Sequence, residues 1–311
     1  LSYQIPYDSV DLDASPSYSL YTDPLADISN ALSQGWYVNV PDYEGPLASM
    51  VAGKQAGHAT LDSVRAVLSS GLGLTPNARY AMWGYSGGSL ASEWAAELQA
   101  QYAPELNFSG AAVGGVLVNV FSALKAITGT YFAELIPAGL IGITNQHPEA
   151  YEYLVSRLKP TGPYNRTTFL SIKNMSWNQS IGPFANQNIY DYFIGGMADL
   201  QAPVLQKIFA SDGVMGHHGV PQMPLFVYNA VADEIATIDL TDALVNQFCA
   251  LGVNILYRRN TVGGHGAEIV NGDASAFKWL SSVLGGTHSM MYSTQGCTIQ
   301  NVTLNVTSSP L

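Results

Sequence analysis

The stretch RYAMWGYSGGSLASEWAAELQA, residues 79–100, combines a short apolar segment, a glycine-rich turn and a segment of helical composition. RYAMW is typical of a buried strand, and SLASEWAAELQA is typical of a helix. Between them, GYSGG matches the G-x-S-x-G pattern, a sharp strand-to-helix turn that exposes a serine hydroxyl. The glycines are required because side chains there would clash with the adjacent strand and helix. Alone the pentapeptide is weak evidence, but in this context it predicts that Ser86 is a nucleophile.

The segments on both sides of this stretch alternate between short apolar runs and amphipathic runs. Strands are expected at residues 1–5, 36–40, 79–83, 111–118, 225–230 and 254–259. Helices are expected at residues 55–71, 89–102, 241–252 and 275–284. This alternation predicts an α/β fold with a mostly parallel sheet and helices on both faces. Right-handed crossovers then place the C-terminal ends of the strands along one edge, where functional sites usually form.

One interval, residues 120–223, breaks the alternation and is too long to be a loop. We expect it to be an inserted, largely helical cap, with residues 1–119 and 224–311 forming the α/β core. A second, independent domain is the alternative. Within the interval, AITGTYFAELIPAGLIGI (residues 126–143) carries Glu134 and a proline. It is therefore predicted to be a buried or ligand-facing helical pair rather than a membrane span.

The composition limits the classes of function. Hydrophobic residues make up 47% of the 311 residues and charged residues only 11%, which is typical of a well-buried globular core rather than disorder. The formal net charge of −11 argues against nucleic acid and anionic membrane surfaces as partners. A neutral substrate, or an acidic working pH, suits this surface better.

Six Asn-x-Ser/Thr sequons and two cysteines indicate the secretory pathway. The acceptor asparagines would be Asn107, Asn165, Asn174, Asn178, Asn301 and Asn305. This pattern predicts glycosylation of a secreted, extracellular protein. In that compartment Cys249 and Cys297 would form one disulfide, and two buried free thiols are the alternative.

A serine nucleophile needs a general base, because its hydroxyl proton must leave as it attacks. The histidines that compete for this role are His58, His147, His217, His218, His265 and His288. Only His265 follows a predicted strand and precedes another helix, inside the glycine-rich turn TVGGHGAE. It is the predicted base, since the chain order serine, acid, histidine places the base there. The adjacent pair His217 and His218 would suit a metal, but the sequence offers no third ligand, so no metal site is predicted.

The acid is expected after the penultimate predicted strand, in LFVYNAVADEIA. Asp233 is preferred over its neighbour Glu234. Asp239 and Asp242 are expected on the following helix instead. The task of Asp233 would be to hold one nitrogen of the histidine protonated and to stabilise the imidazolium. A turn former or a helix cap is the alternative role for this residue.

Hydrogen-bond donors are also needed for the oxyanion of a tetrahedral intermediate. One is expected to be the backbone N–H of Gly87, the residue after the nucleophile. The second should come from the loop after the first predicted strand, which is the region of Tyr7 and Asp8.

Several blocks of the sequence, in order, are similar to one protein family. They are SYQ (2–4), YD (7–8), LDASPSYS (12–19), GWYVNVPDYEGP (35–46), AGHATLDSVRAV (56–67), GYSGG (84–88), YAPELN (102–107), ADEI (232–235) and GGHGAEI (263–269). Together they resemble the fungal secretory lipase family along most of the chain, and the cap is the part least alike. The resemblance implies an α/β-hydrolase fold with a helical cap inserted between the nucleophile and the acid.

The resemblance also implies roles for particular residues. It makes Ser86, Asp233 and His265 the catalytic triad. It also pairs Cys249 with Cys297 in a disulfide near the C-terminus. A further cysteine of the family has no counterpart here, because alanine stands at that position in the LDASPSYS block.

The oxyanion hole implied by the resemblance consists of Asp8 and Gly87. An aspartate is unexpected chemistry there, because a carboxylate would repel an oxyanion. Asp8 can help only through its backbone N–H or as a protonated acid, and an acidic working pH would favour the second option.

The number of predicted strands suggests that this chain is part of a larger assembly. An α/β-hydrolase sheet commonly has eight strands, and six are predicted, with the first pair expected to precede Leu1. The chain thus resembles the large C-terminal part of a processed precursor. We expect an N-terminal fragment of that precursor to remain bound.

These observations predict a secreted serine carboxylic-ester hydrolase, a lipase or esterase, that acts on lipophilic esters through an acyl-enzyme on Ser86 without a cofactor. The apolar stretch of the cap would form the acyl tunnel, and the cap would contact a lipid interface. Acyl transfer, or deacylation of a specialised fungal metabolite by the same triad, is the alternative. A non-catalytic binding protein on a hydrolase fold is a different class, for which lesions in the triad would be expected, and none is visible in the sequence.

Overall fold

The computed structural model describes residues 1–22, 25–75 and 77–306. Within these residues, six strands form one sheet in which each strand runs parallel to its neighbours and the strands follow one another in chain order. The strands are β1 (Ser2–Gln4), β2 (Ala81–Tyr85), β3 (Gly110–Gly114), β4 (Leu225–Ala230), β5 (Ile255–Asn260) and β6 (Cys297–Val302). The predicted α/β class, with a parallel sheet, is confirmed.

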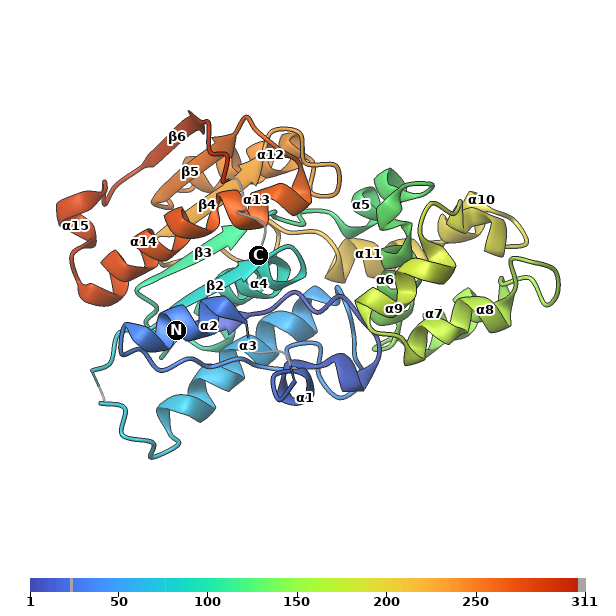
Figure 1. Ribbon diagram of the computed structural model, residues 1–311, viewed down its shortest axis with the longest axis horizontal. Helices are drawn as coiled ribbons and strands as arrows, with labels where there is room; N and C mark the ends of the chain where they lie inside the picture. Colours follow the sequence, from blue (N-terminus) through green and yellow to red (C-terminus); the bar gives the residue numbers. More distant parts are fainter. Residues whose placement is uncertain (23–24, 76, 307–311) are drawn as a thin grey trace.

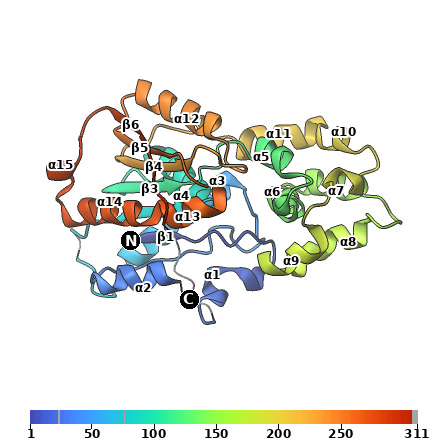
Figure 2. The ribbon, with the colours of Figure 1, turned by 45° about the horizontal axis from the view of Figure 1, so that its top comes forward.

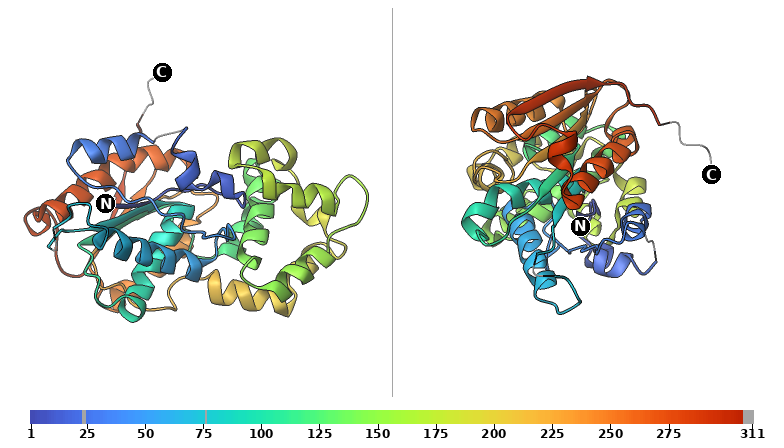
Figure 3. Two further views of the ribbon diagram at one scale, coloured as in Figure 1. Left: turned by 90° about the horizontal axis from the view of Figure 1, so that it is seen from below. Right: turned by 90° about the vertical axis from the view of Figure 1, so that its left-hand side faces the viewer.

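Helices cover both faces of the sheet, as expected. One face carries α3 (Gly53–Leu68), α4 (Gly87–Tyr102) and α12 (Ile238–Ala250), and the other carries α2 (Ala26–Ser33) and α14 (Asp273–Gly285). Successive side chains of a strand point to opposite faces, so Met82 packs into the first layer and Trp83 into the second. The left view of Figure 3 shows the sheet between these two layers of helices. Figure 2 shows α14, which belongs to the second layer, lying along the sheet.

A second group of helices lies between β3 and β4 in the chain. It contains α5 (Val120–Ile127), α6 (Leu135–Thr144), α7 (Pro148–Ser156), α8 (Arg166–Leu170), α9 (Trp177–Phe184), α10 (Met197–Leu200) and α11 (Pro203–Asp212). Shorter elements are α1 (Pro16–Ser19), α13 (His265–Asn271), α15 (His288–Met291), η1 (Leu12–Ala14), η2 (Tyr131–Glu134), η3 (Ser171–Asn174) and η4 (Ile189–Tyr192). In Figure 1 the arrowheads of β2 and β3 point toward this group. The interval is thus largely helical, and its division from the core at residues 120 and 223 stays a prediction.

Two connecting segments join these helices to the sheet and pair with each other. One leads from β3 to α5 (residues 115–119), and the other, the returning connector, leads from α11 to β4 (residues 213–224). Val120 donates its N–H to the carbonyl of Gly213 at 2.9 Å, and Met215 donates to Val118 at 3.0 Å. The returning connector then lies against α4, because the carboxylate of Glu97 accepts hydrogen bonds from the N–H groups of Gly216 and His218.

Two expectations about strands were wrong. Residues 36–40 form no strand and contribute only one bridge, between Asn39 and Ser2. The strand expected at 111–118 ends at Gly114, where Gly115 takes a positive φ of 54° and turns the chain away. The sequence analysis also missed β6, whose residues are exposed or half-buried, so that its sequence has no apolar run to signal it.

The predicted disulfide is present and joins Cys249 at the end of α12 to Cys297 at the start of β6. Among the sequon asparagines, Asn165 is half-buried and caps α8, while the others are exposed. Thr307, which completes the sequon of Asn305, lies outside the described residues. Glycosylation stays a prediction. Across residues 1–22, 25–75 and 77–306, no helix has the length and apolar character needed to cross a bilayer.

Candidate active site

Ser86 lies in the turn between β2 and α4, as predicted. Its φ of 51° and ψ of −120° are strained for a residue with a side chain. The turn is possible because its glycines allow close packing. A Cβ on Gly84 would overlap the carbonyl of Gly88, and a Cβ on Gly88 would overlap the carbonyl of Gln4. The serine is half-buried at the C-terminal end of the sheet.

His265 is the first residue of α13, directly after the turn that follows β5. Its Nε2 lies 2.8 Å from Oγ of Ser86. Its Nδ1 lies 2.8 and 3.0 Å from the two carboxylate oxygens of Asp233. The structure therefore brings together the three side chains that the sequence analysis selected from separate elements.

The turn after β4 holds Asp233 in place. One of its carboxylate oxygens also accepts hydrogen bonds from the N–H groups of Ile235 and Ala236, at 3.0 and 2.7 Å. A carboxylate accepts hydrogen bonds, so the hydrogen between Asp233 and His265 belongs to Nδ1 of the imidazole. Nε2 is then the acceptor that faces the serine hydroxyl, which is the arrangement that a general base requires.

Asp8 follows β1 and has a positive φ of 44°. Its carboxyl lies against the elbow, since a Cβ on Gly87 would stand 2.8 Å from Oδ1 of Asp8. Burial raises the pKa of Asp8 to about 6, and the nearby imidazole of His265 acts in the opposite direction. Burial, and then the charge of Asp8, also raise the pKa of Glu44 well above its ordinary value. Asp8 and Gly87 are thus adjacent, as predicted, and Asp8 is an acid that holds its proton unusually well.

The remaining histidines occupy other places. His58 lies on α3, with its ring centroid 4.0 Å from that of Tyr102. His147 approaches Asp212 at 3.1 Å among the cap helices. His218 stacks on Trp94, so its backbone and ring both hold the returning connector. His217 is exposed beside it, and His288 begins α15. In the described part of the chain, no group of three or more His, Cys, Asp and Glu side chains is arranged to hold a metal ion.

Two residues with a place in the site were missed by the sequence analysis. Glu234, considered only as an alternative acid, accepts a hydrogen bond from the backbone N–H of His265 at 2.8 Å. Tyr85, the first of the two variable residues of the G-x-S-x-G pattern, donates its hydroxyl to the carbonyl of His265 at 2.6 Å. Their positions within the two motifs were the available signal, but neither motif specifies what these side chains contact.

Comparison with known proteins agrees with this geometry. The family model described as secretory lipase matches residues 18–291. The chain belongs to the secretory lipase family. Among similar proteins, a trichothecene C-3 esterase of Fusarium sporotrichioides is 48% identical over 100% of this chain and 71% of its own length. A probable trichothecene esterase of Stachybotrys chartarum is 41% identical over 98% of this chain and 65% of its own length.

Solved structures lead to the same family. Candida antarctica lipase A in its closed state has a TM-score of 0.83 and is 28% identical, over 92% of this chain and 70% of that chain. The α/β-hydrolase fold expected from the resemblance is thereby confirmed. The chain spans about two thirds of the length of these secretory lipase relatives.

Proposed function

We propose that the protein is a serine carboxylic-ester hydrolase that works through an acyl-enzyme on Ser86. The observation that carries this proposal is the 2.8 Å contact between Ser86 Oγ and His265 Nε2, at a strained elbow. The contact of Asp233 with the other ring nitrogen supports it. The esterase and lipase names of the relatives favour ester hydrolysis over other serine chemistry.

In acylation, Oγ of Ser86 bonds to the ester carbonyl carbon while its proton passes to Nε2 of His265. The intermediate collapses when the bond to the leaving oxygen breaks and that oxygen takes the proton from Nε2. In deacylation, His265 takes a proton from water, and the hydroxide attacks the acyl carbon. The carboxylic acid then leaves, and the proton returns to Oγ of Ser86. Asp233 stabilises the imidazolium formed in each half-reaction.

The oxyanion hole is assigned to the backbone N–H of Gly87 and to Asp8. The position of Asp8 against Gly87 supports this assignment. A protonated Asp8 would supply an O–H donor, whereas an ionised Asp8 would repel the oxyanion. Since burial raises the pKa of Asp8 to about 6, the donor form dominates in acidic medium. An acidic working pH, one of the two options that the net charge left open, would favour this donor form.

We assign lipophilic esters as the substrate class. The cap supports this, because most of the residues of α6, in the stretch singled out for a ligand-facing role, are buried and apolar. A more specific candidate is an ester of a specialised fungal metabolite. This candidate is favoured by the two relatives that are named as trichothecene esterases, at 48% and 41% identity. Acyl transfer to an alcohol instead of water uses the same residues and is the second candidate reaction.

The decisive experiment is covalent labelling with a fluorophosphonate, followed by mapping of the labelled peptide. Label on Ser86 in the folded protein supports the proposal, and a folded protein that stays unlabelled overturns it. Rates on p-nitrophenyl esters of increasing chain length, compared with an acetylated trichothecene alcohol, separate a general lipase from a metabolite esterase. Product analysis in mixtures of water and alcohol separates hydrolysis from acyl transfer.

We further propose that the protein is secreted and glycosylated, and that its cap contacts a lipid interface. Membership of the secretory lipase family supports secretion. The exposed sequon asparagines support glycosylation, which an endoglycosidase mass shift would test. Faster hydrolysis above the solubility limit of an ester substrate would indicate interfacial contact, and an unchanged rate would refute it.

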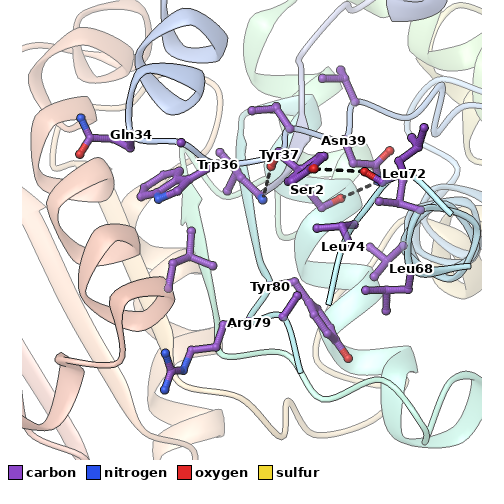
Figure 4. A pocket seen from close by; sticks show the side chains of 18 of the residues that line it. Ser2, Gln34, Trp36, Tyr37, Asn39, Leu68, Leu72, Leu74, Arg79 and Tyr80 are labelled. Carbon is purple, nitrogen blue, oxygen red and sulfur yellow. Dashed lines mark hydrogen bonds between the residues drawn. The ribbon is translucent and has the colours of Figure 1, made fainter. Parts of the chain in front are cut away.

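A groove of about 520 Å³ lies next to Leu1 and Ser2, between residues 34–40, α3 and α14 (Figure 4). Its walls include Trp36 and Val38, Val64 and Leu68 from α3, and Leu284 from α14. Residues 36–40 lie beside β1, where Asn39 bridges Ser2, so an added segment would cover the apolar walls of the groove rather than the edge of β1.

We propose that this groove binds an upstream segment of the same precursor. The greater length of the relatives supports this occupant. Native mass spectrometry of material purified without denaturant should show a second, smaller chain. A single species with the mass of this chain and full activity would overturn the proposal.

A further inference from the structure

The backbone of His265 is held at both of its polar groups. Oε2 of Glu234 accepts the N–H of His265 at 2.8 Å, and the hydroxyl of Tyr85 donates to its carbonyl at 2.6 Å. Neither contact involves the imidazole ring, whose nitrogens face Asp233 and Ser86. The two contacts therefore fix the position of the backbone from which the imidazole ring extends, whereas Asp233 fixes the orientation of the ring.

The local chain explains why such control is needed. His265 follows Gly263, which has a φ of 83°, and Gly264. Glycine has more backbone freedom than any other residue, so the approach to His265 is intrinsically loose. A displacement of about 1 Å in a catalytic group can cost about 10²-fold in rate. External hydrogen bonds to the backbone of His265 would remove this looseness.

The glycine itself is part of the arrangement. A Cβ on Gly264 would overlap Oε2 of Glu234. The carboxylate can therefore reach the N–H of His265 only because residue 264 has no side chain. The hydrogen bond between Glu234 and the N–H of His265 can therefore be broken by a change at Glu234 or by a side chain at residue 264.

We propose that Glu234 is a positioning residue, whose carboxylate fixes the backbone of His265 so that Nε2 meets Ser86. Tyr85 holds the carbonyl of the same residue. Glu234 takes no proton and touches neither substrate nor reacting atoms in this role. The inference deepens the proposed function and rests on it.

Two substitutions separate position from charge. Glu234→Ala removes the acceptor, whereas Glu234→Gln keeps an acceptor oxygen and removes only the charge. We expect Glu234→Ala to lower kcat and the second-order rate of fluorophosphonate labelling by about 10- to 100-fold, with KM within about twofold. We expect Glu234→Gln to restore most of both rates. Asp239→Ala is the matched control, because Asp239 is also an exposed acid and lies in the first turn of α12, the next helix along the chain.

The contact can also be broken from the other side. Gly264→Ala should reproduce the loss seen in Glu234→Ala. The double variant should lose little more than either single variant, because both changes remove the same contact. Tyr85→Phe should lower the labelling rate independently. If Glu234→Ala does not fold, as judged by circular dichroism, Gly264→Ala and Glu234→Gln still test the proposal.

The outcomes distinguish this inference from the proposed function. If wild-type protein is labelled at Ser86 but folded Glu234→Ala is labelled at the same rate, the positioning role is wrong and the proposed function stands. If Glu234→Gln is as slow as Glu234→Ala, charge rather than position is responsible, and the inference also fails. If folded wild-type protein is not labelled at all, the proposed function fails first.

Discussion

Within the described residues there are two histidine–aspartate pairs, one at the C-terminal edge of the sheet and one among the cap helices. In the first, Nδ1 of His265 lies 2.8 Å from Asp233, and the side chains are 8% and 0% exposed. In the second, Nε2 of His147 lies 3.1 Å from Asp212, and the side chains are 37% and 7% exposed. The chemical components are the same, but the surroundings differ.

The difference lies in what else each pair contacts. Asp212 is shared, because Lys54 of α3 approaches it at 3.5 Å and Ser211 donates its hydroxyl to it at 2.9 Å. The serine beside this pair thus bonds to the carboxylate and not to the histidine. Asp212 joins a core helix to the cap helices, which is a structural role. A histidine–aspartate pair becomes a base only when the free ring nitrogen faces a nucleophile.

The largest expected effect separates the two serines. Ser86→Ala should lower kcat/KM for ester hydrolysis by about 10⁵-fold or more, because the nucleophile is removed, and it should abolish fluorophosphonate labelling. Ser211→Ala, beside the other pair, should be labelled as fast as wild type. Labelling of folded Ser86→Ala at the wild-type rate would show that Ser86 is not the nucleophile.

The next effect separates the two aspartates. Asp233→Asn should lower kcat by about 10⁴-fold, because an amide favours the wrong tautomer of the imidazole. Asp212→Asn should change kcat by less than about twofold. Steady-state kinetics on one soluble ester measure both. A loss of similar size in the two variants would show that the cap pair also takes part in catalysis.

A pH effect is expected at Asp8. Because the pKa of Asp8 is about 6, the wild-type enzyme should lose an oxyanion donor as pH rises through 6. Asp8→Asn supplies an N–H donor at every pH, so the ratio of its kcat/KM at pH 8 to that at pH 5 should exceed the wild-type ratio several-fold. If the two proteins have equal ratios, the side chain of Asp8 is not an oxyanion donor, and only its backbone N–H can take that role.

The stability of the fold should respond to the same group. The pKa of Asp8 is raised in the folded state above its ordinary value near 4, so the native protein holds more protons than the unfolded chain between about pH 4 and pH 6. Stability contributed by this group is therefore lost as pH rises through that window. Urea denaturation of Asp8→Asn should show a flatter dependence there, and an unchanged slope would contradict the assignment.

The smallest effects concern the cap pair alone. Asp212→Ala should lower the free energy of unfolding by about 1–3 kcal/mol, because a largely buried acceptor with three partners is removed. His147→Ala should cost no more than about 1 kcal/mol, as expected for a half-exposed pair. Thermal and urea denaturation measure both changes. Loss of hydrolytic activity in folded His147→Ala would contradict the structural role.

The parts of the site that were predicted from sequence depend on local rules. The elbow at Ser86 needs glycines next to a strand and a helix, and the position of His265 follows from the strand before it. The short contact between the two residues needs the whole fold, yet the topology of parallel sheets makes it foreseeable, since strand ends share one edge.

The rest could not be predicted because it depends on tertiary contacts without a sequence pattern. The single bridge at Asn39 and the polar edge strand β6 are set by the neighbours that each segment meets. The role of Glu234 depends on the direction of one side chain in a tight turn. Asp8 was placed near Gly87 by the order of strands and by family resemblance, but its raised pKa arises from burial that only the structure shows.

The carboxylate of Glu97 has a mechanical consequence. Glu97 lies about three turns along the helix that starts directly after Ser86, and it receives the backbone of the returning connector at Gly216 and His218. The turn that carries the nucleophile and the side chain that anchors the returning connector therefore belong to one helix. The geometry of α4 thus sets where the chain coming back from the cap lies relative to Ser86.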